Sequence, residues 1–117
     1  MDGVIVSFET AKLLKKKGFD KFCHSTYVRQ GENVNVVATP CYNSTADFNW
    51  YSAPSLTMVL DWLLTDNDLF VSFYPDGKNV LYNIYKGGVK CANSDKAFKT
   101  PEEACESAIN YCLTLIK

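Results

Sequence analysis

The sequence predicts an α+β protein built as a two-layer sandwich, in which an antiparallel sheet of four or five strands carries three helices on one face. Two observations lead to this prediction. Residues 69–74 and 79–85 are rich in β-branched and aromatic residues and flank a Pro-Asp-Gly turn, which is typical of an antiparallel hairpin. Three other segments repeat apolar residues at helical spacing, and each stripe needs a sheet face to cover it. The expected order is α-β-β-α-β-β-α, in a single α+β domain over residues 1–117.

Composition limits the function classes. The chain has 117 residues, of which 47% are hydrophobic and 21% charged, as in an ordinary globular domain. The formal net charge of -1 argues against a protein specialised for nucleic acid or anionic membranes, which depends on clustered Lys and Arg. No segment approaches the ~20 apolar residues of a membrane span, and Asp2 stands where a signal peptide has basic residues. We therefore expect a cytoplasmic protein without membrane contact.

The first helix is expected over residues 8–17. Ser7 is a suitable N-cap, because its hydroxyl can accept from the backbone of the first turn. Apolar residues recur at spacing three, and lysines 15–17 complement the dipole of the last turn. Gly18 is expected to close the helix in the left-handed conformation, with Phe19 folding back onto Leu14.

Two strands and a second helix are expected next. Residues 22–29 and 33–38 have the composition and partial alternation of a hairpin, and residues 40–47 are expected to form a polar loop. The second helix begins after Ser55 with a stripe at spacing i, i+3, i+4, i+7, and it ends near residues 65–68.

The hairpin of residues 69–85 has two different faces. Side chains along the first strand alternate between the two faces. One face is apolar, with Leu69, Val71 and Phe73, and the other is mixed, with Phe70 and Tyr74. Gly87–Gly88 ends the second strand, and residues 89–91 are a short further strand. Thr100, followed by Pro101 and Glu103, begins the last helix as N-cap, N1 and N3.

The cysteines and the one histidine give no catalytic or metal motif. The five cysteines form no C-x-x-C pair, so neither a zinc site nor a thioredoxin-like motif is indicated, and we expect small buried hydrophobes in a reducing setting. His24 adjoins Cys23, but neighbours along a strand point to opposite faces. Cys41, Cys91 or Cys112 could still approach His24 in space. We expect no catalytic residue, metal or cofactor.

Surplus aromatic and apolar residues are the candidate contact residues. They form a loop group and a group on the mixed sheet face, namely Phe48, Trp50, Tyr51, Phe70, Tyr74, Leu81 and Tyr85. An exposed patch of this kind often marks an interface, although the loop group could instead cover the core at the start of the second helix. We therefore expect a non-enzymatic protein that acts by protein–protein binding or self-assembly as a homodimer.

Two alternatives remain open. The sheet aromatics could stack on the bases of a single-stranded nucleic acid, with a backbone track of lysines 12, 15–17 and 21. A small-molecule pocket or a dispersed hydrolase site could use Asp61, Asp66 and Asp68, although their spacing does not indicate paired acid–base chemistry.

Three segments of the chain resemble a known group of proteins. Residues 8–20, residues 51–63 with their Ala-Pro-Ser-Leu helix opening, and residues 98–109 with their Glu-Glu-Ala run are similar, in order and spacing, to small proteins of phages and prophages of gut bacteria. Those proteins often have Leu in place of Lys17 and usually Thr in place of Ser55, and both differences are structural. The resemblance implies a phage-linked accessory protein of the host cytoplasm, with no assigned activity and no active-site residue to transfer.

Overall fold

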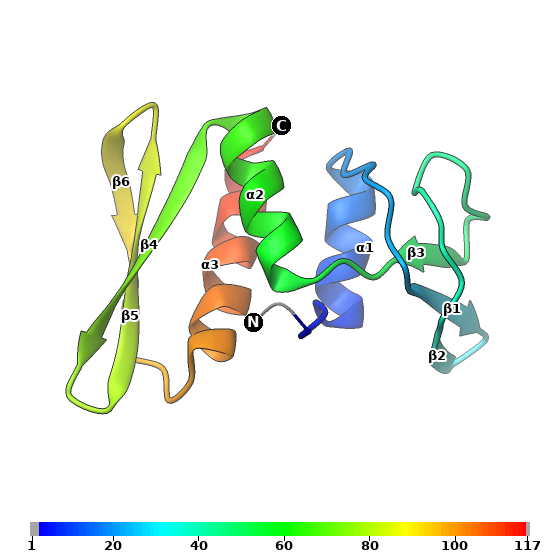
Figure 1. Cartoon of the computed structure of the whole chain (residues 1–117), viewed down its shortest axis with the longest axis horizontal. Helices are drawn as coiled ribbons and strands as arrows, with labels where there is room; N and C mark the ends of the chain where they lie inside the picture. Colours follow the sequence, from blue (N-terminus) through cyan, green and yellow to red (C-terminus); the bar gives the residue numbers. More distant parts are fainter. Residues whose placement is uncertain (1–2, 117) are drawn as a thin grey trace. The chain divides into compact units, whose positions relative to one another are not determined.

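The computed structural model describes residues 3–116 and is of the expected α+β class (Figure 1). The described chain forms two three-stranded antiparallel sheets. In chain order the elements are α1 (Phe8–Lys16), β1 (Thr26–Gln30), β2 (Asn33–Val37), β3 (Trp50–Ser52), α2 (Leu56–Asn67), β4 (Leu69–Asp76), β5 (Asn79–Lys86), β6 (Val89–Asn93) and α3 (Pro101–Leu115). The chain divides into two compact units, an N-terminal unit of residues 5–55 and a C-terminal unit of residues 3–4 and 56–116.

The first helix is capped as the sequence predicts. Ser7 Oγ accepts from the backbone N–H of Thr10 at 3.3 Å. At the other end Gly18 has a φ of 91°, and the N–H of Phe19 donates to the carbonyl oxygen of Leu14 at 2.9 Å. This 6→1 bond is the mark of a Schellman closure, and it turns Phe19 into the core, where it is fully buried.

The sheet of the N-terminal unit has the strand order β2-β1-β3. The hairpin of β1 and β2 is confirmed, with Gly31 at a φ of 64° in its turn. The third strand, β3, is an addition that the sequence analysis did not include, and it pairs with the free edge of β1. α1 packs against β3. The apolar core of this unit consists of Val6, Ala11, Leu14, Phe19, Cys23 and Ala53.

The sheet of the C-terminal unit has the strand order β4-β5-β6. Its long hairpin is confirmed, from the pair Leu69↔Lys86 to the pair Asp76↔Asn79. Gly77 supplies the positive φ of 64° in the turn. The Gly87–Gly88 turn, with φ values of 58° and 81°, then leads into β6, which confirms the short extra strand and extends it to Asn93.

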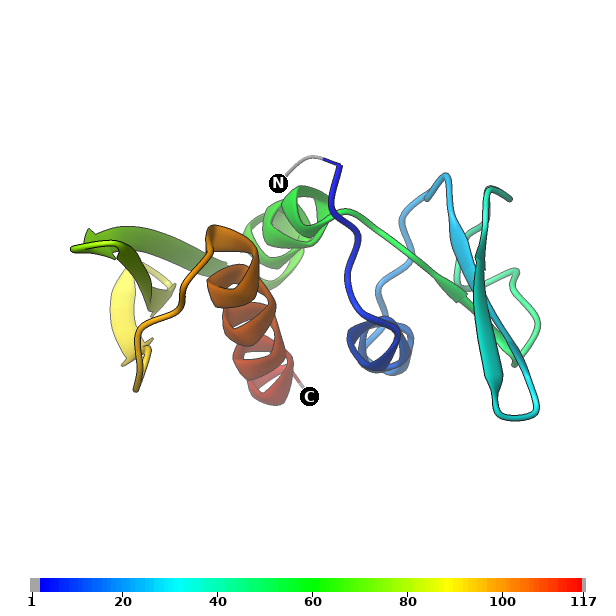
Figure 2. The same cartoon turned by 90° about the horizontal axis from the view of Figure 1, so that it is seen from below.

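Helices α2 and α3 lie side by side on one face of this sheet (Figures 1 and 2). Thr100 is the N-cap of α3, because its hydroxyl oxygen accepts from the N–H of Glu103 at 3.1 Å. The Tyr82 hydroxyl group reaches α3 and lies 3.2 Å from Ser107 Oγ. The apolar core of this unit consists of Leu56, Val59, Trp62, Leu63, Leu69, Val71, Tyr82, Ile84, Phe98, Ala104, Cys105, Ala108, Ile109, Cys112 and Leu113.

A single sheet of four or five strands with three helices on one face is not confirmed. The two hairpins belong to separate sheets, and α1 belongs to the N-terminal unit while α2 and α3 cover the sheet of the other. Each hairpin takes its third strand from nearby in the chain, which costs less loop-closure entropy than joining the distant hairpin. The single domain over residues 1–117 stays a prediction.

Candidate binding surface

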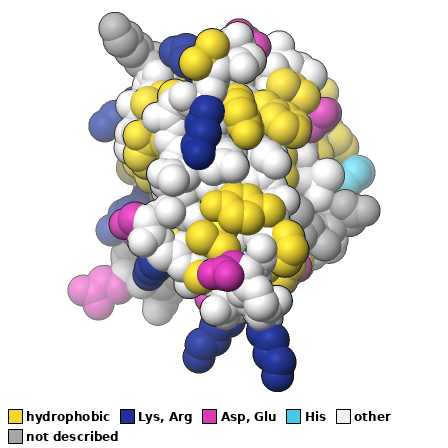
Figure 3. Space-filling view, turned by 90° about the vertical axis from the view of Figure 1, so that its left-hand side faces the viewer, with side chains coloured by type: hydrophobic (Ala, Val, Ile, Leu, Met, Phe, Trp, Pro, Cys, Tyr) yellow, Lys and Arg dark blue, Asp and Glu magenta, His cyan; other side chains and the backbone are white. Residues whose placement is uncertain are grey.

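The sheet of the C-terminal unit has an outer face, which we define as the face opposite α2 and α3. Along β4 the side chains alternate as predicted: Leu69 and Val71 are buried toward the helices, whereas Phe70 is 48% exposed and Tyr74 is 38% exposed. Figure 3 looks onto this side of the molecule, and hydrophobic side chains gather across its middle. Large apolar groups therefore meet solvent on a face that the helices leave uncovered.

Register brings the predicted sheet residues together in pairs. Phe70 lies opposite Tyr85, with ring centroids 6.2 Å apart and planes tilted by 39°. Tyr74 lies opposite Leu81. Cross-strand pairs of this kind add some stability to a sheet, but the exposed part of each ring stays available to a partner.

A hollow of ≈ 410 Å³ opens beside the Phe70–Tyr85 pair. Its lining consists of Leu64, Asp68, Phe70, Ser72, Tyr85 and Gly88. The hollow thus combines apolar walls with a carboxylate and a hydroxyl group, which is the usual make-up of a recognition site.

The backbone explains why Asp68 stands at this hollow. Asp68 has a φ of 56°, in the left-handed region, where it links α2 directly to β4. Its carbonyl oxygen accepts from the N–H of Gly87 at 3.2 Å, so the link is bonded to the turn before β6. A Cβ atom on Gly87 would lie 3.4 Å from Asp68 Oδ2, which places the carboxylate against that turn.

Leu64 is not among the residues predicted from the sequence, and Asp68 was predicted only as part of a small-molecule pocket or a dispersed hydrolase site. Leu64 is 46% exposed although it belongs to the apolar part of α2. A signal for Leu64 does exist in the sequence. Leu63 and Leu64 are adjacent, and only Leu63 lies on the apolar stripe of the helix, so Leu64 points away from the core. No sequence feature predicts that Asp68 lines the hollow, because its position depends on how the following strand pairs.

The outer face carries opposite charges along its length. Asp76 ends β4 at the hairpin turn, in the same alternation as Phe70 and Tyr74, and it is exposed. Lys90 lies at the other end, where it pairs with Tyr85, and it is also exposed. Lys78 adds a positive charge at the hairpin-turn end of the face, and Asp68 adds a negative charge at the end where Lys90 lies.

The predicted loop residues do not form one patch. Phe48 is 81% exposed, whereas Trp50 and Tyr51 are consecutive residues of β3 and so point to opposite faces. The Tyr51 ring packs edge-on against Phe8, with centroids 5.4 Å apart. Lys15 Nζ lies 5.0 Å from the Tyr51 ring centroid. Tyr51 is therefore a packing contact of α1, and only Phe48 stays largely open to solvent.

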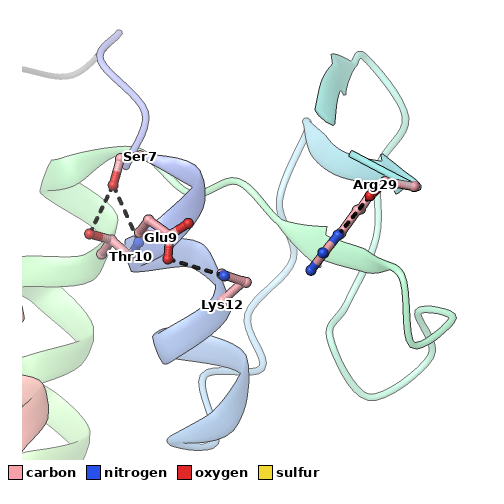
Figure 4. A network of polar contacts seen from close by, with 6 residues as sticks. Ser7, Glu9, Thr10, Lys12 and Arg29 are labelled. Carbon is pink, nitrogen blue, oxygen red and sulfur yellow. Dashed lines mark hydrogen bonds and ion pairs between the residues drawn. The ribbon is translucent and has the colours of Figure 1, made fainter. Parts of the chain in front are cut away.

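Two lysines of the nucleic-acid alternative, and Arg29, which that alternative does not include, make contacts within the N-terminal unit. Lys12 Nζ lies 3.1 Å from Glu9 Oε2, and Arg29 Nε donates to the carbonyl oxygen of Gly31 at 3.0 Å (Figure 4). Lys15 Nζ donates to the carbonyl oxygen of Trp50 at 2.8 Å. These residues and the aromatics of the outer face belong to different units, and the alternative stays a prediction.

Three of the five cysteines are buried, as the sequence analysis expects. Burial raises the pKa of Cys23 to about 11 and the pKa values of Cys105 and Cys112 to about 12. Cys41 is half-buried, and Cys91 is exposed, which departs from the expectation. Over residues 3–116, no group of three or more His, Cys, Asp or Glu side chains is arranged to hold a metal ion.

One buried polar residue was not predicted from the sequence. Asn43 lies in the segment expected to be a polar loop, yet it is 7% exposed. Its Nδ2 donates to the carbonyl oxygen of Phe19 at 2.8 Å, and its Oδ1 accepts from the N–H of Ser52 at 2.9 Å. Asn43 therefore joins the end of α1 to β3.

Comparison with known proteins adds no relative to this picture. No family model matches the chain, and no curated protein or solved structure is significantly similar to it. The resemblance to small phage proteins stays an expectation that rests on three segments. Among the helices of residues 3–116, none combines the length and the apolarity that a membrane crossing requires.

Proposed function

We propose that this chain is a non-enzymatic accessory protein that acts by protein–protein binding, and that the outer face of β4–β5–β6 is its binding surface. One observation carries the proposal. The helices cover one side of the sheet, while the other side presents Phe70, Tyr74, Leu81 and Tyr85. Two of these, Phe70 and Tyr85, line a hollow of ≈ 410 Å³. Aromatic side chains are enriched at the centre of protein interfaces, where they provide much of the binding energy. The link to a phage rests on the resemblance alone.

We propose a second copy of the chain as the partner, because the charges of the outer face are compatible with it. Each end of the outer face carries one acid and one lysine: Asp76 and Lys78 at the hairpin end, Asp68 and Lys90 at the other. A two-fold axis matches the same patch on both copies. If the two sheets pack with their strands reversed, the hairpin end of each copy faces the other end of its partner, and each end carries both signs of charge, so no end meets a surface of a single like charge.

The outer face is small for a protein interface. Strands of 8 residues are about 26 Å long, and three strands are about 14 Å wide. This gives roughly 400 Å² for each copy, about half of the ~800 Å² per partner in a standard interface. We therefore propose a weak dimer that forms in the high micromolar range.

Sedimentation equilibrium at increasing concentration tests this proposal. The chain is expected to change from monomer to dimer, and Tyr74→Glu is expected to keep it monomeric because the change buries a charge at the interface. Tyr111→Glu is the matched control, since Tyr111 is 43% exposed on α3 and lies away from the outer face. A chain that stays monomeric at the highest concentration, or a dimer that Tyr74→Glu leaves intact, would overturn the proposal.

A further inference from the structure

Two of the five cysteines face each other in the N-terminal unit. Cys23 and Cys41 lie opposite in an isolated antiparallel bridge. The N–H of Cys23 donates to the carbonyl oxygen of Cys41 at 3.1 Å, and the N–H of Cys41 donates back at 3.0 Å. Residues that exchange both bonds have Cα atoms about 5.5 Å apart, within the range of about 4.4–6.8 Å that disulfides span. Their side chains leave the bridge on the same side, so the backbone brings the two thiols together.

The two sulfur atoms also share a polar neighbour. Cys41 Sγ lies 3.3 Å from Ser52 Oγ, and the Ser52 hydroxyl group is a hydrogen-bond partner of the Cys23 thiol as well. Thr26 Oγ1 donates to Cys41 Sγ at 3.0 Å. Thr26 and Ser52 are opposite residues of β1 and β3, and both are fully buried. Both thiols therefore meet at the buried Ser52 hydroxyl group, and Cys41 also contacts the Thr26 hydroxyl group.

We propose that Cys23 and Cys41 are a thiol–disulfide exchange site. The two residues form a reversible disulfide with each other by exchange with low-molecular-weight disulfides of the glutathione class. Cys41 is half-buried whereas Cys23 is 1% exposed, so Cys41 meets the reagent first. Its thiolate attacks one sulfur of the reagent, which forms a mixed disulfide and releases one reagent thiolate. The thiolate of Cys23 then attacks the sulfur of Cys41, and the second reagent thiolate leaves as the Cys23–Cys41 bond forms.

The exchange is balanced in electrons and protons. The cysteine pair loses two electrons and two protons, and one reagent disulfide gains them to become two reagent thiols. Only a thiolate attacks in such exchange. Because burial raises the pKa of Cys23 to about 11, its thiolate is scarce, which slows ring closure by Cys23.

The other cysteines lack this geometry. Cys105 and Cys112 are seven residues apart in α3, which is a rise of about 10 Å along the helix and exceeds the span of a disulfide. Cys91 is exposed on β6, where it can accept the reagent as a mixed disulfide. The expected bond is therefore specific to Cys23 and Cys41.

The disulfide would tie the base of the first hairpin. It closes the segment of residues 24–40, which contains β1 and β2. A cross-link of this kind restricts the unfolded chain more than the folded one. We therefore expect the N-terminal unit to unfold at higher urea concentration when the pair is oxidised.

Oxidised glutathione and peptide mapping test the site. The full chain with Cys91→Ser, which removes the exposed thiol, is equilibrated with oxidised glutathione, alkylated, digested and analysed by mass spectrometry. The expected result is the loss of two thiols and one linked peptide that joins Cys23 to Cys41, reversed by dithiothreitol. The matched variant that also carries Cys41→Ser is expected to give no linked peptide.

Three results would overturn the proposal. All four thiols of the Cys91→Ser chain could stay free at equilibrium, since five cysteines less one leaves four. The linked peptide could join other cysteines. Cys41 could hold glutathione without Cys23 ever displacing it.

Discussion

A single amide side chain, that of Asn43, joins two elements of the N-terminal unit. It donates to the carbonyl oxygen of Phe19 and accepts from the N–H of Ser52, and it is itself buried. Removing the Asn43 side chain would remove both of these hydrogen bonds, and the loss of a buried hydrogen bond is costly. Asn43 therefore stabilises the fold through two hydrogen bonds to backbone groups in a buried position.

We predict that Asn43→Ala lowers the free energy of unfolding of the N-terminal unit by about 1–3 kcal/mol. Urea denaturation followed by circular dichroism measures the change. Ser44→Ala is the control, because the neighbouring Ser44 is exposed and contributes its backbone N–H to Asp20. Equal stability of the two variants would show that the Asn43 side chain is dispensable.

The buried thiols of α3 are expected to make the folded chain less stable as the pH rises into the alkaline range. Burial raises the pKa values of Cys105 and Cys112 from 9.0 to about 12. Between these values the unfolded chain loses protons that the folded chain keeps, so deprotonation favours unfolding. Their contribution is complete below about pH 9 and is lost as the pH rises toward 12.

We therefore predict a steeper alkaline loss of stability for the natural chain than for Cys112→Ala. Each thiol lowers the free energy of unfolding by up to about 1.4 kcal/mol per pH unit in this window. Urea titrations at several pH values from 8 upward give the slope, and the stability of Cys112→Ala near pH 8 corrects for the smaller side chain. Parallel slopes for the two chains would contradict this origin of the pH dependence.

At the scale of elements, capping residues decide where the helices begin. The Thr100 hydroxyl oxygen accepts from the N–H of Glu103 at 3.1 Å, and Pro101 follows at the first position of α3. A helix start leaves N–H groups without a partner inside the helix, and an N-cap satisfies one of them.

We predict that Thr100→Ala destabilises the C-terminal unit by about 1 kcal/mol. Thermal or urea unfolding detects a change of this size. Thr100→Asp is expected to restore the loss, because its carboxylate accepts the same bond and suits the helix dipole. A loss that Thr100→Asp does not restore would assign the effect to another contact of Thr100.

Local signals account for the elements that the sequence predicts well. α1, α3 and the β4–β5 hairpin begin or end at residues whose chemistry is local: Ser7, Gly18, Thr100 and Gly77. β3 has only three residues and exists because it pairs with β1, more than twenty positions earlier. Asn43 is buried for the same reason, since its partners Phe19 and Ser52 belong to other elements. Such features depend on tertiary contacts that no local pattern encodes.

At the scale of the whole molecule, the sequence predicts the faces of a sheet better than the number of sheets. The alternation along β4 and β5 identifies the outward residues Phe70, Tyr74, Leu81 and Tyr85. The same patterns do not tell whether two hairpins join, because strand pairing depends on which free edges meet. Here β3 pairs with one edge of β1 and β6 with one edge of β5, which completes two separate three-stranded sheets.

The central proposal is that the outer face receives a second copy of the chain. Amide chemical shifts followed by NMR, from tens of micromolar to about a millimolar, test this most directly. We expect concentration-dependent shifts that cluster on the outer face and its charged ends, with α1 as the internal reference; the residues concerned are Phe70, Tyr74, Leu81, Tyr85, Asp68, Asp76 and Lys90. Shifts confined to α1 and β1–β3, or none across that range, would contradict it.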